Sequence, residues 1–97
     1  MITTQAILKH KYDSPSGNVS YLLFHAEENF SFNEGQFMML EVTIDGIAKK
    51  KPYSIATTNR MIQEEKLIGF IVKKASEQGV SNFLTQTIQL GDSITMK

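Results

Sequence analysis

Short apolar runs separated by turn residues occupy most of the chain. The runs have the length and pattern of β-strands, and the intervals between them suit antiparallel neighbours. We expect strands over residues 6–12, 19–26, 36–44, 67–74 and 93–96, with a further strand that begins at Pro52. Turn residues punctuate them at 14–18 and at Asp45-Gly46, a pair suited to positive backbone angles. The pattern predicts an antiparallel meander or Greek key.

One segment alone has helical spacing. Its apolar residues share one face of a helix: Val80, Phe83, Leu84 and Ile88. Ser81 is placed to cap the first turn, and Gly91 follows the end. The simpler interpretation is a short amphipathic helix that closes one end of a barrel. The second interpretation adds that Gly79 lets the backbone approach an anion, at which the free amides of the helix start point.

Composition agrees with a single small module, because 97 residues with 41% hydrophobic side chains supply one core. Ten basic residues balance ten acidic ones, which gives no electrostatic case for nucleic acid or an anionic membrane. The absence of cysteine excludes disulfides, thiol catalysis and cysteine-ligated zinc or iron-sulfur clusters. His10 and His25 are isolated on strand-like runs, so no metal site is expected.

No apolar run has the length of a membrane span, and residues 1–5 lack the charged and apolar regions of a secretory signal. We therefore expect a cytoplasmic protein.

The tetrapeptide Lys51-Pro52-Tyr53-Ser54 combines groups that suit a flavin. A cation can meet a pyrophosphate, an aromatic ring can lie against an isoalloxazine face, and a hydroxyl can hydrogen-bond a flavin ring nitrogen. The same four residues also fit an ordinary junction between a turn and a strand. The tetrapeptide alone therefore leaves both interpretations open.

The order of motifs along the chain resembles the flavin-binding domain of the ferredoxin-NADP reductase family. The segments that carry the resemblance are 34–40, 51–56, 70–74, 79–84 and 90–94, and they cover most of the chain in the family's order. The resemblance implies a mainly all-β fold, a six-stranded antiparallel Greek-key β-barrel of the riboflavin-synthase-like type with one short capping α-helix. It also implies a single flavin-binding domain over residues 1–97.

The resemblance further implies a cofactor site without a catalytic side chain, because the flavin itself performs the hydride and electron chemistry. Lys51 would contact the pyrophosphate of FAD or the phosphate of FMN, Tyr53 would pack against the flavin or its ribityl chain, and Ser54 would hydrogen-bond N5. The other expected cofactor-binding residues are Pro52, Ile71, Val72, Lys73, Gly79, Val80 and Ser81. Residues 71–73 would act largely through backbone atoms and residues 79–81 by holding the pyrophosphate, which favours the dinucleotide FAD.

The chain departs from the family pattern at several positions. Lys51 replaces an arginine and lacks its bidentate fork, Glu34 replaces a proline, and Gln78 lies where many relatives carry a glycine. The sequence ends at Lys97, about where relatives continue into a nicotinamide-binding domain, and it contains no Gly-x-Gly-x-x-Gly fingerprint. We therefore expect NAD(P)H to act only through a missing domain or a partner.

These observations leave different functions to compare. The first is the FAD-binding domain of an NAD(P)H-dependent electron-transfer oxidoreductase, with a nicotinamide-binding domain or subunit and an electron-acceptor protein as partners. The alternative is a non-catalytic small β-barrel interaction module with a degenerate flavin site. A barrel that binds nucleic acid is disfavoured by the neutral charge. The segment from Ser93 to Lys97 is also expected to form a barrel edge able to pair with a neighbouring chain.

Overall fold

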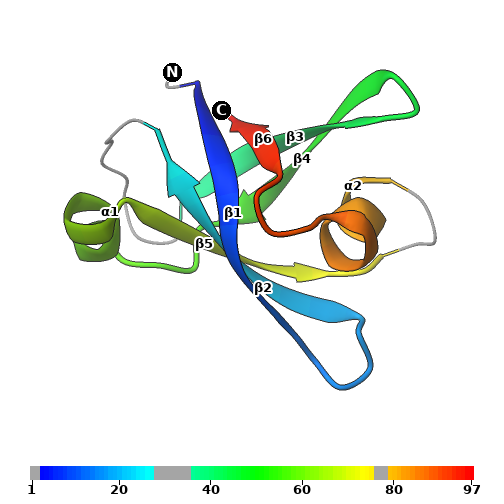
Figure 1. The fold of residues 1–97 in the computed structure, drawn as a ribbon, viewed down its shortest axis with the longest axis horizontal. Coiled ribbons are helices and arrows are strands. Elements are labelled where there is room, and N and C mark those ends of the chain that lie inside the picture. The colour runs from blue at the N-terminus through cyan, green and yellow to red at the C-terminus, as the bar shows by residue number, and fades with distance from the viewer. Residues whose placement is uncertain (1–2, 28–35, 76–78) are drawn as a thin grey trace.

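A computed structural model describes residues 3–27, 36–75 and 79–97 of the chain (Figure 1). Its strands are β1 Thr4–Asp13, β2 Val19–Ala26, β3 Phe37–Ile44, β4 Ile47–Ser54, β5 Leu67–Lys73 and β6 Ser93–Met96. They form one six-stranded sheet in the order β4-β3-β6-β1-β2-β5, and each neighbouring pair in this order is antiparallel. The sheet curls until its two outermost strands meet at a bridge between Ile55 and Phe70. The predicted six-stranded antiparallel Greek-key barrel is confirmed.

The expected position of the last strand at an edge is wrong. β6 lies between β3 and β1, and it pairs with both. The sheet edges are instead β4 and β5. Glu34 and Gln78, two of the positions that depart from the family pattern, lie outside the described residues, as does Gly35.

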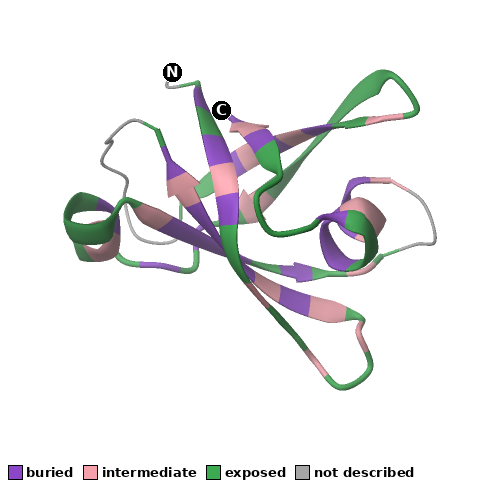
Figure 2. Ribbon diagram, viewed as in Figure 1, coloured by how far each residue is buried: buried purple, intermediate pink, exposed green. Residues whose placement is uncertain are grey.

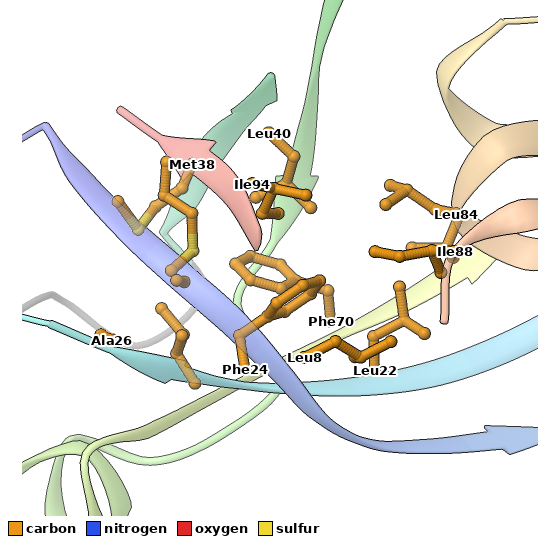
Figure 3. Close-up of a cluster of buried hydrophobic side chains, with 14 of the residues drawn as sticks. Leu8, Leu22, Phe24, Ala26, Met38, Leu40, Phe70, Leu84, Ile88 and Ile94 are labelled. Atoms are coloured by element: carbon orange, nitrogen blue, oxygen red, sulfur yellow. The ribbon is translucent and has the colours of Figure 1, made fainter. Parts of the chain in front are cut away.

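Buried and more exposed positions alternate along several strands (Figure 2), and the buried side chains fill the interior of the barrel. Phe24 and Phe70 lie at its centre with ring centroids 6.3 Å apart and ring planes inclined by 63°, an edge-to-face geometry that suits aromatic quadrupoles. Leu84 from the helical segment and Ile88, which follows it, face Leu22 (Figure 3). Each such side chain contributes roughly 1.5–3 kcal/mol through burial.

β1 is irregular between Leu8 and His10, where its pairing with β2 shifts by one residue. An extra residue of this kind reverses the alternation of side chains along a strand. Leu8 therefore faces the core before the irregularity, and Lys11 faces the same side after it. The Nζ atom of Lys11 donates hydrogen bonds to the main-chain oxygen of Thr85 at 3.0 Å and to Oδ1 of Asp13 at 2.7 Å. The bulge thus fastens β1 to the helix.

The β3–β4 hairpin starts its fourth strand earlier than predicted, at Ile47 instead of Pro52. Asp45 and Gly46 form a two-residue turn with φ of 52° and 77°, and Ile44 pairs directly with Ile47. A turn of this type places the flanking residues in register at once. The strand escaped detection because residues 47–52 are all exposed and show no alternation of apolar and polar positions.

A helix that the apolar pattern did not predict, α1, spans Asn59–Glu65. The Thr58 hydroxyl accepts a hydrogen bond from the Met61 amide at 3.2 Å, and Lys66 ends the helix in the left-handed region at φ 57°. Ile62 is its one buried residue. A helix with a single buried apolar position has no stripe for periodicity to reveal.

The predicted helix exists but differs in detail. α2, Val80–Asn82, continues directly into a π-helical turn, η1, Phe83–Thr87. The helix therefore ends before Ile88, which is extended, and Gly91 belongs to a later turn. Ser81 does not cap it, because the cap residue is Gly79 and makes no side-chain hydrogen bond.

Candidate functional site

The expected cofactor residues gather where the two edge strands separate. Ile55, the residue after β4, forms a bridge with Phe70 of β5, and the Ala56 amide donates to the Gly69 oxygen at 2.8 Å. On the described residues beyond that bridge, β4 pairs with β3 and β5 pairs with β2. Edge strands present backbone donors and acceptors on their free side. The site is therefore built first from main-chain groups.

The hydrogen bonds of β5 show which of its residues face the free side. The Lys74 amide donates to the Asn18 oxygen at 2.7 Å. Because hydrogen bonds between antiparallel strands involve every second residue, the backbone groups of the even-numbered residues of β5 point toward β2. Odd-numbered positions point away from β2, as the Gly69 amide does in donating to Thr57 Oγ1 at 3.0 Å. The backbones of Ile71 and Lys73 therefore point away from β2, on the side of β5 that meets the residues after β4 at the bridge. This arrangement supports their expected contact with a cofactor through main-chain atoms.

Val72, the residue between them, lies differently. Its backbone is directed toward its partner Ser20 on β2, and its side chain is fully buried in the core. The structure therefore gives Val72 a packing position and separates it from Ile71 and Lys73.

The same alternation applies to β4. The Ile55 amide donates to the Gln36 oxygen at 2.8 Å, so odd-numbered positions bond β3, and Pro52 and Ser54 direct their backbones to the free side. Proline has no amide hydrogen to donate. It therefore occupies a position where the β3–β4 ladder needs no donor.

The side chains of the tetrapeptide divide between the two faces of β4. Lys51 pairs with Leu40 and Tyr53 with Met38, and both partners are buried core residues. Paired residues share a face of the sheet, so Lys51 and Tyr53 lie on the core side. Ser54 lies on the opposite face, since neighbouring side chains alternate. A flavin at the strand edge would therefore meet the phenol and the Ser54 hydroxyl from different directions.

Tyr53 carries a feature that points to a ligand. Its ring packs against the core cluster, and its hydroxyl is buried without a hydrogen-bond partner among the described residues. Burial raises the pKa of this phenol above its ordinary value of 10.0, so it remains a hydrogen-bond donor at neutral pH. An unpaired buried hydroxyl costs free energy. A ribityl hydroxyl or a flavin carbonyl would supply the missing acceptor.

Gly79 leaves room for a ligand at the helix start. Its φ of 95° favours glycine, and a side chain added there would meet no atom within 4 Å. The amides that follow it are those of a first helical turn, which lack acceptors within the helix. Val80 contributes its side chain to the core, so only its backbone can face a phosphate.

The Ser81 hydroxyl is engaged elsewhere. It accepts a hydrogen bond from the Ala75 amide at 3.0 Å, and the residue is only 3% exposed. This contact ties the end of β5 to the helix. Ser81 therefore positions the helix start with its side chain, and its backbone amide is the group that remains for an anion.

A pocket of about 440 Å³ adjoins this site between the β3–β4 hairpin and the helix. Lys49 lines it together with Gly79 and Asn82, whereas Lys51 does not. Sequence reasoning assigned a ligand role to Lys51 alone within the lysine run. The missed signal was alternation, since Lys49 pairs with the core residue Val42 and shares the face of Lys51.

Other kinds of site find no support in the part of the chain that the structure describes. No group of three or more histidine, cysteine or carboxylate side chains there could hold a metal ion. None of the helices there is both long and apolar enough to cross a membrane. His10 instead stacks on Tyr12 at a centroid distance of 6.3 Å.

Fold and site together define a cofactor-binding antiparallel barrel. The family model of the oxidoreductase FAD-binding domain matches residues 7–97. The chain therefore belongs to this family, that of the ferredoxin reductase-like FAD-binding domains, and the resemblance found in the sequence is confirmed. No curated protein matches the chain by sequence.

Solved structures show the same fold. The cytochrome b5 reductase domain of Ulva prolifera nitrate reductase matches 99% of this chain and 39% of its own at 21% identity and a TM-score of 0.75. A ferredoxin NADP+ reductase from Neisseria gonorrhoeae with bound FAD and NADP matches over 97% of this chain and 36% of its own length, at 15% identity and a TM-score of 0.78. The CS-b5R domains of human Ncb5or in the NAD+ form match over 98% of this chain and 29% of their own length, at 17% identity and a TM-score of 0.76. This chain thus spans 29 to 39% of their lengths.

Proposed function

We propose that this chain holds FAD as the redox centre of an NAD(P)H-dependent oxidoreductase. The observation that carries the proposal is the buried hydroxyl of Tyr53, which has no hydrogen-bond partner among the described residues and lies on an edge strand of a domain in the FAD-binding family. A barrel that had lost its flavin site would have no reason to retain this costly group. That argument disfavours the interaction-module alternative.

In this proposal each part of the site binds a different part of the cofactor. The Lys51 ammonium meets the pyrophosphate, the Tyr53 ring and hydroxyl hold the isoalloxazine or its ribityl chain, and the Ser54 hydroxyl meets N5. Main-chain groups of Ile71 and Lys73 border the flavin. The amides at 79–81 complete the phosphate site.

The bound flavin would accept hydride and pass electrons onward, while these residues orient it and keep it in place. We propose that NAD(P)H is supplied by a nicotinamide-binding domain or subunit, and that a further protein accepts the electrons. Support comes from the greater length of the structural neighbours and from the NADP and NAD+ named for two of them.

The decisive test is flavin retention. The purified chain is mixed with FAD, free ligand is removed by gel filtration, and absorbance near the flavin bands and fluorescence are measured. We expect retained flavin in the parent chain and about tenfold weaker binding in Lys51→Ala, in line with the loss of one charge-assisted contact.

Lys66→Ala is the matched control, since this exposed lysine ends α1 on a different element. A folded parent chain that retains no flavin at all would contradict the proposal.

A further inference from the structure

β3 and β6 separate before β3 ends. Their pairing stops at Glu41 and Thr95, although β3 continues to Ile44 and β6 begins at Ser93. From there β3 runs on into the projecting hairpin with β4 (Figure 1). The opening between Thr43 and Ser93, here called the β3–β6 gap, holds a pocket of about 340 Å³, a volume within the range of ligand sites.

Main-chain groups of both strands point into the β3–β6 gap. Farther along the same pair of strands, Met39 and Lys97 exchange two hydrogen bonds of 3.0 Å each. Because hydrogen bonds between antiparallel strands involve every second residue, the backbones of Thr43 and Ser93 are directed toward each other as well. No strand pairing joins these two residues in the part of the chain that the structure describes. The gap therefore presents the open edges of two strands, which can bond an added extended chain.

The side chains around the gap include two carboxylates. Glu41 and Asp92 both line the pocket, and none of the described residues that line it is basic. The Lys97 Nζ atom donates to Oε1 of Glu41 at 3.1 Å, and the Gln89 amide donates to Oδ2 of Asp92 at 2.9 Å. Within residues 3–27, 36–75 and 79–97, the second oxygen of each carboxylate has no hydrogen-bond partner. One ammonium thus faces two carboxylates, and the pocket keeps a negative charge.

The floor of the pocket is apolar. Val42 and Ile94 belong to the core, and Phe83 packs against it. A ligand that fills the pocket therefore needs an apolar part for the floor and a cationic end for the carboxylates. The side chains of lysine and arginine combine a methylene stem with such a cation.

We infer that the β3–β6 gap binds an extended basic segment of a partner protein, with an arginine or lysine side chain in the pocket. The segment adds to the open edges as a short strand and bonds the Thr43 amide and the Ser93 oxygen. Its cation reaches the free oxygens of Glu41 and Asp92. The negative charge of the walls selects a basic segment over an acidic one. The gap lies between strands other than β4 and β5, whose edges form the proposed flavin site, so the inference does not depend on flavin binding.

Amide NMR titration of the chain with the peptide acetyl-Val-Arg-Val-amide tests the inference. The matched probe carries citrulline instead of arginine, which keeps the shape of the side chain and removes its charge. We expect saturable shifts centred on Thr43, Ser93 and Thr95. The citrulline peptide should bind roughly fivefold more weakly, in line with the loss of one charge-assisted contact. Hydrogen exchange of the Thr43 amide should slow when the arginine peptide is bound.

Single variants locate the bound cation. Glu41→Gln and Asp92→Asn should each weaken binding of the arginine peptide about three- to tenfold. Asp45→Asn is the control, because it removes a carboxylate from the nearby hairpin turn, outside the pocket, and it should leave binding unchanged.

Equal affinity of the parent chain for the two peptides would overturn the inference. So would shifts centred away from the gap, or a folded chain that shows no saturable shift. An equal loss in Asp45→Asn would also overturn it, since that result would reveal only a general attraction between charges. The comparison of the two peptides uses the parent chain, so it stands whether or not a variant folds.

Discussion

Lys11 on β1 reaches the main-chain oxygen of Thr85 in the π-helical turn, with its Nζ atom 3.0 Å away. The side chain of Lys11 is only 16% exposed, and it joins residues 74 positions apart in the sequence. This contact holds the helix, and with it the Gly79 end of the candidate site, against the barrel.

Replacement of Lys11 by methionine should destabilise the chain by about 1 kcal/mol, because the Thr85 oxygen and the Asp13 carboxylate both lose a donor. For a domain of this size that change lowers Tm by about 4–8 °C. Thermal unfolding followed by circular dichroism measures it. Lys9→Met is the control, since Lys9 is an exposed residue of the same strand with the same charge. Equal Tm shifts in the two variants would show that the contact with Thr85 is unimportant.

The free energy of unfolding should decrease in acid, because protonation of the Asp13 carboxylate removes its contribution to stability. Hydrogen bonds from Lys11 and Ser20 hold the pKa of this carboxyl below its ordinary value of 3.8. A folded-state pKa below the unfolded one stabilises the fold above pH 4, and that contribution disappears as pH falls through the folded value. Urea unfolding from pH 7 to pH 2.5 should therefore show parent and Asp13→Asn curves that converge at low pH. A constant separation of the two curves would contradict the linkage.

Tyr53→Phe should have opposite effects on stability and on flavin binding. Removal of a buried hydroxyl that has no partner among residues 3–27, 36–75 and 79–97 should leave the flavin-free chain equally stable or up to about 1 kcal/mol more stable. The same change removes the donor proposed for the cofactor, so FAD affinity should drop several-fold. Chemical unfolding without flavin and fluorescence titration with FAD give the two values. A loss of stability in the flavin-free variant would mean that the hydroxyl has a partner within the protein.

Gly69→Ala should destabilise the barrel by about 1–3 kcal/mol through overpacking. An added methyl group would lie 2.8 Å from the Thr57 methyl and 2.9 Å from atoms of Leu23 and Tyr21. Thr57→Ser removes the nearest of these contacts and keeps the hydroxyl that accepts from the Gly69 amide. The double variant should therefore recover part of the loss, as measured by urea unfolding. Additive losses would indicate that the crowding at Thr57 is not the cause.

The sequence was sufficient to predict those strands that have one face buried in the core and the other face exposed to solvent. Along β2 the inward side chains of Leu22 and Phe24 are buried, and the pattern predicted the strand with the bounds that the structure has. β4 lacked such a pattern because its start lies at the open edge of the barrel, where both faces meet solvent. α1 lacked it because Ile62 alone is buried. Apolar periodicity detects elements only where one face is covered.

The candidate site divides in the same way. The motif identified Tyr53 and Gly79, and the structure gives both a feature that suits a ligand. Alternation along a strand separates Ser54 from Tyr53, but residue spacing could not show which of the two faces the core or that the Ser81 hydroxyl is bonded to Ala75. It also could not show that Lys49 lines a pocket together with Gly79. These properties depend on the register of β4 with β3 and on how the helix docks, both of which join residues distant in the sequence.

Pro52 has a consequence for behaviour at high concentration. An open sheet edge invites a second copy of the chain to add its own strand, which leads to dimers and fibres. Here the outward amide is missing at Pro52, and the adjoining lysines would repel the same charges on an approaching copy. The edge of the barrel at β4 is therefore accessible to a small molecule but resists the addition of a strand from a second copy of the chain.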